Sequence, residues 1–222
     1  MPKIETTEFP IKQELKPSEL LSVSDVIVFD MDGTLYLLDG DNYGYQNSSL
    51  YRLVSANAQR LITERENLSE ESANKLIAKI LSQNQHLSQV LGKKYGLNRQ
   101  EYFNIVWDID PQGILNHFEA SQTVIRTLHQ TGKEIILLTS GPQIWQNRVI
   151  DHLGLNDCFT QIYTGEDFVD KDEVFTQLSL LYPKKRFLSI GDQLQTDILP
   201  AQALGMNTYH INHPNDLLLL LK

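Results

Sequence analysis

The fold is decided by the stretch Asp25–Tyr36, which has the sequence DVIVFDMDGTLY. Its four apolar residues, 26–29, form a short unbroken run that is typical of a strand buried on both faces of a sheet. Asp30 and Asp32 follow, and because residues i and i+2 of an extended chain point to the same side, both carboxylates can face one site. Gly33 permits a turn and a close approach of the backbone to a ligand. Acidic residues in this place predict a ligand site, because open α/β sheets bind ligands at the carboxyl ends of their strands.

A hairpin is the alternative interpretation of this stretch, because an Asp-Gly pair after a strand often forms a hairpin turn. A hairpin requires a second strand with matching alternation. The residues after Tyr36 are instead loop-like and then helical in pattern. We therefore favour the ligand site, to which Thr34 adds a hydroxyl group.

The size and charge of the chain limit the possible partners. The 222 residues suffice for one sizeable core with a small accessory domain, and the formal net charge is −9. This surplus of negative charge disfavours a nucleic-acid polymer or a membrane as partner, whereas a small phosphorylated metabolite remains compatible if a cation neutralises it. The single cysteine, Cys158, fits a reducing compartment. Residues 1–16 lack the apolar core of a signal peptide and Leu217–Leu221 is too short to span a bilayer, so we expect a cytoplasmic protein.

Three segments of the chain differ in pattern. Residues 1–24 contain three prolines and little periodicity, and we expect them to form an N-terminal arm. Residues 38–111 carry apolar side chains at helical spacing, which predicts an inserted all-helical cap domain. Residues 25–37 and 112–222 together predict the core domain, because strand-like and helical segments alternate there. The expected fold class is therefore α/β, with a Rossmann-like parallel-sheet core and a helical cap domain inserted into it.

The alternation in the second part of the core predicts individual elements. The expected helices are 119–130, 143–153, 173–181 and 196–204, and the expected strands are 134–138, 159–163, 187–190 and 208–211.

Thr139 and Ser140 follow the predicted strand 134–138 and precede a predicted helix. Gly141 suits the N-cap of that helix and Pro142 its first position, so free backbone N–H groups should point out of its N-terminus. A hydroxyl group beside such a helix end predicts a site for phosphate at Thr139 and Ser140. The alternative is that Thr139 only caps the helix.

Two further strand ends carry charged groups. Lys171 lies between a strand-like segment and the next helix, where its amine can neutralise a phosphate, although a solvated surface lysine is the alternative. Asp192 follows another strand and Gly191, in the same relation to its strand as Asp30. Asp197 lies a little further along, either near the same site or as a cap of the next helix.

These groups form a coherent chemical set for phosphoryl transfer. Three aspartates supply hard oxygen ligands, which Mg²⁺ prefers. Asp30 is ionised at neutral pH and can attack phosphorus without activation, which gives an aspartyl-phosphate. Asp32 can protonate the leaving oxygen and then take a proton from the attacking water. Mg²⁺, Lys171 and Thr139 would stabilise the charge on the equatorial oxygens.

The sequence resembles the haloacid dehalogenase (HAD) superfamily. The resemblance extends from Val26 to the C-terminus, and it lies in four motifs that each follow a predicted strand, namely DMDGTL at 30–35, Thr139, Lys171, and Gly191-Asp192 with Asp197. It implies that Asp30 is nucleophile and metal ligand, that Asp32 is acid/base and metal ligand through its carbonyl, and that Thr139 and Lys171 bind phosphate. It also implies that Asp192 binds the metal and that Asp197 supports the metal site.

Finer features place the chain within this superfamily. The inserted segment is similar to the helical cap of C1-type members, and DMDGTLY resembles the branch that contains pyrimidine 5′-nucleotidases. Asp32 argues against a dehalogenase, because dehalogenases of the superfamily lack the second acid. One departure is Asp172, which stands where the family usually has proline after the lysine and leaves Lys184 and Lys185 as substitutes for Lys171.

We therefore expect a Mg²⁺-dependent phosphomonoester phosphatase for a small phosphorylated metabolite, with a nucleoside monophosphate as one candidate. A sugar phosphomutase with the same nucleophile and a non-catalytic binding protein on the same fold are the alternatives. The substrate would be selected by the cap and by a loop or flap predicted at 37–46, with Tyr36, Tyr43 and Tyr45 as candidates. A basic and aromatic group at 93–99 is better interpreted as solvated cap surface. We expect a monomer or a homodimer.

Overall fold

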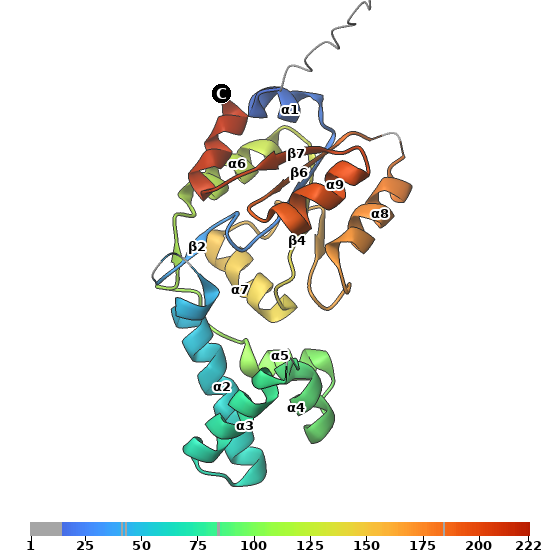
Figure 1. Ribbon diagram of the computed structural model, residues 1–222. Helices are drawn as coiled ribbons and strands as arrows, with labels where there is room; N and C mark the ends of the chain where they lie inside the picture. The colour runs from blue at the N-terminus through green and yellow to red at the C-terminus, as the bar shows by residue number, and fades with distance from the viewer. Residues whose placement is uncertain (1–14, 41, 43, 84, 184) are drawn as a thin grey trace, which may run out of the picture.

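The structure, a computed structural model, describes residues 15–40, 42, 44–83, 85–183 and 185–222. Tyr43, Lys184 and residues 1–14 of the predicted arm lie outside the described residues. The remainder of that arm contains one short helix, α1 (Pro17–Val23), which lies beside the C-terminal segment of the chain (Figure 1).

The core is a parallel sheet of five strands in the order β5-β4-β1-β6-β7. The strands are β1 (Val26–Phe29), β4 (Glu134–Leu138), β5 (Gln161–Tyr163), β6 (Phe187–Gly191) and β7 (Asn207–His210). The chain moves outward from β1 through β4 to β5 and then returns to the other side of β1, so the boundary of β1 and β6 is the point where strand order reverses. Open α/β sheets bind ligands at such a point.

Helices cover both faces of this sheet, which explains why the apolar run of β1 is unbroken. Ile27 and Phe29 pack on the face covered by α6 (Glu119–Gln130), α7 (Gln143–Leu153) and the C-terminal 3-10 helix η4 (Pro214–Leu221). Val26 and Val28 pack on the face covered by α8 (Lys171–Leu181) and α9 (Leu199–Ala203). The predicted α/β fold class with a parallel sheet is confirmed.

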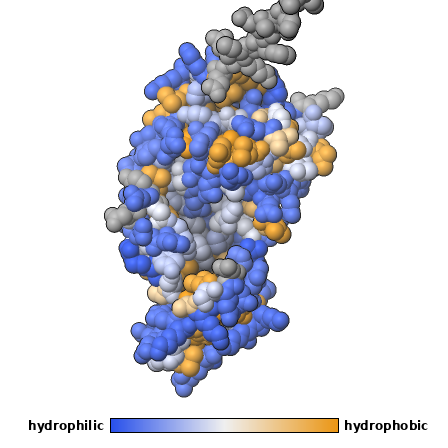
Figure 2. Space-filling model, in the orientation of Figure 1, coloured by the Kyte–Doolittle hydropathy of each residue, from blue (hydrophilic) through white to orange (hydrophobic). Residues whose placement is uncertain are grey.

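The inserted region is all-helical. After the 3-10 turn η2 (Tyr45–Asn47), it consists of α2 (Ser49–Glu66), α3 (Glu70–Ser82), α4 (Leu87–Tyr95) and α5 (Arg99–Val106), and it lies below the sheet in Figure 1. The first helix is capped by Ser48, the second by Ser69 and the last by a capping box of Asn98 and Glu101. Figure 2 shows that most of the surface of this region is hydrophilic on the side that faces the viewer.

Two short strands connect the helical region to the sheet. Strand β2 (Leu37–Leu38) leads into the region and β3 (Leu115–Asn116) leads out of it, and the two pair in antiparallel fashion. Gly40 and Gly113 flank this ribbon with φ angles of +108° and +77°, a conformation that favours glycine. The entry and the exit of the insertion are therefore held side by side.

The ends of β5, α8, β6 and β7 differ from their predicted bounds by one or two residues, so that Lys171 is the first residue of α8. Two further predictions differ more. The helix α7 begins at Gln143 with Pro142 as its N-cap, so Gly141 lies outside the helix rather than at its N-cap. The predicted helix 196–204 is a π-helical turn, Leu194–Ile198, followed by the short α9. Within the described part of the chain, no helix combines the length and the apolarity needed to cross a membrane.

Candidate active site

The site lies at the carboxyl end of β1, and its central group is Asp30. In the register of the sheet, Phe29 is level with Leu137 of β4 and Ile190 of β6, so the loops that follow these three strands converge. Asp30 is 6% exposed. One of its carboxylate oxygens accepts a hydrogen bond of 2.6 Å from Lys171 Nζ, and the other accepts one of 3.1 Å from Thr34 Oγ1. Its carboxylate is thus fixed in orientation by two donors.

Lys171 connects two acidic residues that are distant in sequence. Its Nζ lies 2.6 Å from an oxygen of Asp30 and 2.6 Å from an oxygen of Asp197. Burial alone would lower the pKa of Lys171, but the two carboxylates outweigh it and raise that pKa above its usual value. The amine is therefore a permanent cation within the site. Lys185, the sequence-based substitute, instead pairs with Glu134 at the opposite end of the sheet.

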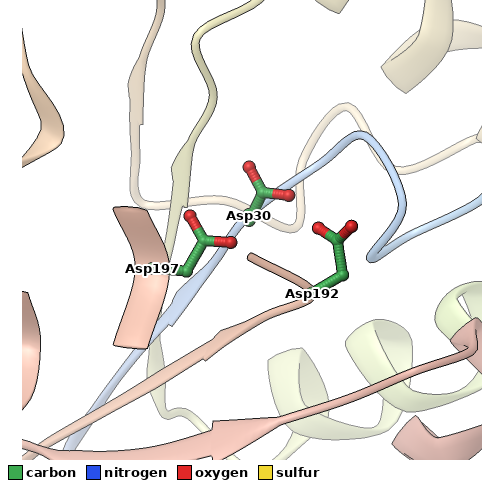
Figure 3. A group of neighbouring side chains, drawn as sticks. All are labelled: Asp30, Asp192 and Asp197. Carbon is green, nitrogen blue, oxygen red and sulfur yellow. The ribbon is translucent and has the colours of Figure 1, made fainter. Parts of the chain in front are cut away.

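Three carboxylates converge from separate segments of the chain. Asp30 follows β1, Asp192 follows β6, and Asp197 lies in the π-helical turn, and Figure 3 shows their side chains directed to one place. One oxygen atom of each lies within 4.8 Å of the others. Asp197 also accepts a hydrogen bond of 3.0 Å from the backbone N–H of Gln193, which fixes it in the turn. The side chain of Asp32 is not part of this cluster.

The cluster fits a hard divalent cation. Among the described residues, Lys171 supplies the positive charge that pairs with two of the three carboxylates, so negative charge is in excess. Burial, and then the charges of Asp30 and Asp197, raise the pKa of Asp192 to about 7. Burial and the charge of Asp30 also raise the pKa of Asp197. Carboxylate oxygens are the ligands that Mg²⁺ prefers, and a divalent cation would remove the electrostatic conflict that these shifts express.

Two glycines lie so close to the carboxylates of this cluster that a side chain would not fit. Gly33 has a φ of +85°, and a Cβ atom there would lie 2.4 Å from an oxygen of Asp192. A Cβ atom on Gly191 would lie 2.3 Å from an oxygen of Asp197. Both distances are far below van der Waals contact, so only a residue without a side chain permits this arrangement of the acids.

Asp32 lies beside the cluster with a different set of partners. One of its oxygens accepts a hydrogen bond from the hydroxyl of Tyr36, and the other is 3.4 Å from Thr139 Oγ1. Tyr36 in turn accepts a hydrogen bond of 3.1 Å from the indole N–H of Trp145. Burial raises the pKa of Asp32, although the hydrogen bond from Tyr36 opposes this shift. A raised pKa suits a group that must carry a proton near neutral pH.

The loop after β4 supplies neutral donors. Thr139 is fully buried, and its Oγ1 accepts a hydrogen bond of 2.9 Å from the N–H of Gly141. Ser140 is exposed. A Cβ atom built on Gly141 would lie 3.1 Å from Thr139 Oγ1 and 3.4 Å from an oxygen of Asp32. The backbone of this loop thus passes directly beside the acid/base candidate.

The candidates for substrate specificity have different environments. Tyr36 is fully buried and its hydroxyl is engaged by Asp32, which disfavours a contact between Tyr36 and a substrate. Tyr45 is 39% exposed, stacks on Trp107 with ring centroids 5.9 Å apart and meets Tyr51 edge-on. Tyr43 lies outside the described residues.

The basic and aromatic group of the cap is engaged in local contacts. Lys94 forms a salt bridge with Glu66, whose carboxylate also accepts a hydrogen bond from Tyr95. Arg99 lies over the ring of Phe103. These contacts favour the interpretation of this group as solvated cap surface.

Sequence reasoning missed one residue of the site. Trp145 is fully buried, and its indole N–H belongs to the hydrogen-bond chain that ends on Asp32. A buried tryptophan usually finds an acceptor for its N–H. That rule signals a partner for Trp145, but it does not identify Tyr36, which is distant in sequence.

Comparison with known proteins adds independent information. A family model described as haloacid dehalogenase-like hydrolase matches residues 24–205. Phosphoglycolate phosphatases from Vibrio vulnificus and Vibrio cholerae are 25% and 26% identical to the chain over 198 residues. These alignments cover 85% of this chain and 85% and 86% of the two relatives. Since these relatives are not nucleotidases, they give no support to the nucleotidase branch expected from DMDGTLY.

Solved structures show the same fold. The HAD-hydrolase YfnB from Bacillus subtilis, bound to magnesium, has a TM-score of 0.52 at 21% identity and matches over 90% of this chain and 99% of its own. A predicted phosphoglycolate phosphatase from Haemophilus somnus has a TM-score of 0.54 at 17% identity and matches over 90% of this chain and 98% of its own. The family model spans most of the chain, from two residues before β1 to two residues after α9, and includes all three acids of the cluster. The chain therefore belongs to the haloacid dehalogenase-like hydrolases.

Proposed function

We propose that the protein is a Mg²⁺-dependent phosphomonoester phosphatase that acts through an aspartyl-phosphate on Asp30. The observation that carries this proposal is the environment of Asp30. Its buried carboxylate pairs with Lys171, and one of its oxygens lies within 4.8 Å of an oxygen of Asp192 and of Asp197. The phosphoglycolate phosphatases among its relatives support this class of reaction.

In the first step, a carboxylate oxygen of Asp30 attacks phosphorus and the bond from phosphorus to the ester oxygen breaks. Lys171 and Thr34 hold the carboxylate in place before the attack. Asp32 delivers a proton to the leaving oxygen, so that an alcohol rather than an alkoxide departs. Thr139 and Lys171 donate hydrogen bonds to the non-bridging oxygens of the phosphoryl group.

In the second step, water attacks the aspartyl-phosphate and Asp32 takes up its proton. Inorganic phosphate leaves and the carboxylate of Asp30 is regenerated. Asp32 therefore serves as acid and then as base, which its raised pKa allows. Asp30 and Asp192, with the backbone carbonyl of Asp32, would hold Mg²⁺ while Asp197 supports them. The bound ion would neutralise the charge that develops on the phosphoryl oxygens.

The substrate that we propose is a small phosphate monoester. Phosphoglycolate is the candidate that the relatives suggest, and a nucleoside monophosphate is the candidate suggested by the sequence of the first motif. A screen of phosphate release from phosphoglycolate, nucleoside monophosphates, sugar phosphates and flavin mononucleotide, with Mg²⁺ or with EDTA, would test both. Release without any sugar bisphosphate separates a phosphatase from a phosphomutase. Failure of every ester would favour a binding protein.

The exchange of Asp30 for asparagine tests the mechanism. An amide is not a nucleophile for phosphorus, so Asp30→Asn should lower turnover on the order of 10⁴-fold or more. Asp172→Asn is the matched control, because it removes an exposed carboxylate from the first turn of α8 and should retain wild-type turnover. Phosphate release is the measurement, and circular dichroism should show an intact fold. If Asp30→Asn kept most of the activity, the proposed mechanism would be wrong.

A further inference from the structure

A hydrogen-bond chain joins the interior of α7 to the acid/base candidate. Trp145 donates to the hydroxyl of Tyr36 at 3.1 Å, and that hydroxyl donates to Asp32 Oδ1. Both aromatic side chains are 0% exposed. The hydrogen bond between these two side chains is therefore shielded from water, and its geometry is set by the packing of the protein.

The direction of this chain is fixed by its first member. An indole N–H can only donate, so the Tyr36 oxygen must accept there and its own hydrogen is left to point at Asp32. Asp32 Oδ1 is consequently the acceptor of this pair, and the Tyr36 hydroxyl holds that oxygen on the side of α7.

Oδ2 is the oxygen that faces the phosphate-binding loop. It accepts a hydrogen bond of 3.4 Å from Thr139 Oγ1 and lies 3.4 Å from the position that a Cβ atom would occupy on Gly141. The hydrogen bonds from Trp145 and Tyr36 thus hold Oδ1 on one side, so that Oδ2 is directed toward the loop after β4.

We propose that Tyr36 and Trp145 are positioning residues that orient the carboxyl group of Asp32, so that its Oδ2 faces the loop after β4. This proposal rests on the proposed function, in which Asp32 protonates the leaving group. It replaces the sequence-based role of Tyr36 as a substrate contact. A purely structural role would require only aromatic volume at these two positions, and phenylalanine would then serve equally well in both.

The test is the response of Tyr36→Phe to the leaving group. The variant keeps the ring and loses the hydroxyl, so Asp32 is free to rotate. With an alkyl phosphate, whose leaving oxygen needs a proton, kcat/KM should fall by roughly 10- to 100-fold, a part of the usual contribution of general acid catalysis. With 4-nitrophenyl phosphate, whose leaving group departs as an anion, the fall should be less than about twofold. KM should change little for either ester.

Two further variants complete the design. Trp145→Phe removes the N–H that orients the Tyr36 hydroxyl and should show the same leaving-group dependence with a smaller amplitude. Tyr182→Phe removes a hydroxyl that pairs with Gln161 in another part of the core and should leave both rates unchanged. An equal loss on both esters, or no loss in Tyr36→Phe, would overturn the proposal.

Crystal structures of the two phenylalanine variants give a readout that needs no activity. We expect the Asp32 carboxylate to be rotated in Tyr36→Phe, and an unchanged orientation in both variants would also overturn the proposal. A wild-type protein that hydrolyses no ester would instead refute the proposed function, and these crystal structures would still decide whether Tyr36 orients Asp32.

Discussion

At the scale of single residues, the site depends on one buried cation. The side chain of Lys171 is 5% exposed, and it forms salt bridges with Asp30 and Asp197, which are equally inaccessible. Taking three charges out of water is costly, and the cost is offset only while all of them remain paired. Lys171 therefore supports the fold and the proposed chemistry at once.

Replacing Lys171 should show how much the stability of the fold depends on this buried charge. In EDTA, Lys171→Met should lower the free energy of unfolding by about 3–5 kcal/mol, because it leaves buried carboxylates without a counter-charge. Lys185→Met is the matched control, since its pair with Glu134 is 41% exposed on the lysine side and should contribute at most about 1 kcal/mol. Urea denaturation measures both. Equal losses in the two variants would contradict this account.

At the scale of elements, the turn after β1 sets the geometry of the acids. Gly33 passes so close to Asp192 that no side chain fits between them, and its positive φ turns the chain at once after Asp32. The backbone of the first motif is therefore in close contact with the Asp192 side chain of the fourth motif.

A methyl group at position 33 should displace the carboxylate of Asp192. Gly33→Ala should raise the Mg²⁺ concentration needed for half-maximal activity, because Asp192 must move away from the new Cβ atom. Gly205→Ala is the control for backbone strain alone, since its φ is +76° and its Cβ would meet open space. Magnesium titrations of both variants provide the comparison. A similar magnesium requirement in both would show that the contact with Asp192 is unimportant.

The elements also show how far a sequence can be interpreted. The helices Glu119–Gln130 and Gln143–Leu153 and the strand Glu134–Leu138 have the predicted bounds, because local periodicity and end signals agree there. The π-helical turn at Leu194–Ile198 was not predicted. It places Asp197 against Lys171 and beneath Gly191, and a sequence pattern cannot report such tertiary contacts.

The same limit applies to the site. The motif acids could be predicted because they follow strands whose carboxyl ends must meet at one edge of a parallel sheet. The partners of Asp32 could not, since Trp145 reaches Tyr36 only through the packing of α7 on the sheet. Which buried polar groups pair is decided by three-dimensional packing.

At the scale of the whole molecule, the three clustered acids belong to a chain whose formal net charge is −9. The pKa of Asp192 is raised to about 7 in the folded protein, whereas the pKa of an aspartate in an unfolded chain is about 3.9. Between these values the folded state binds more protons than the unfolded state. The stability that Asp192 contributes is therefore greatest in acid and is lost as the pH rises to neutrality.

Magnesium should reverse this loss. In EDTA, the melting temperature of the wild type should fall between pH 5.5 and pH 7.5 by more than that of Asp192→Asn, which has no charge to develop. Added Mg²⁺ should raise the wild-type melting temperature more at pH 7.5 than at pH 5.5, because binding requires ionised carboxylates. Thermal melts at the two pH values measure both effects. Parallel behaviour of the wild type and the variant would disprove this origin of the pH dependence.

The ribbon of β2 and β3 has a consequence for how such a molecule can diversify. Because Leu37–Leu38 and Leu115–Asn116 are neighbours, the ends of the insertion are already joined, and the sheet need not adjust to whatever is attached there. A chimaera that carries a foreign insertion at this ribbon should keep the hydrolytic machinery and acquire the donor's selectivity. Chemistry and choice of substrate can then be inherited as separate modules.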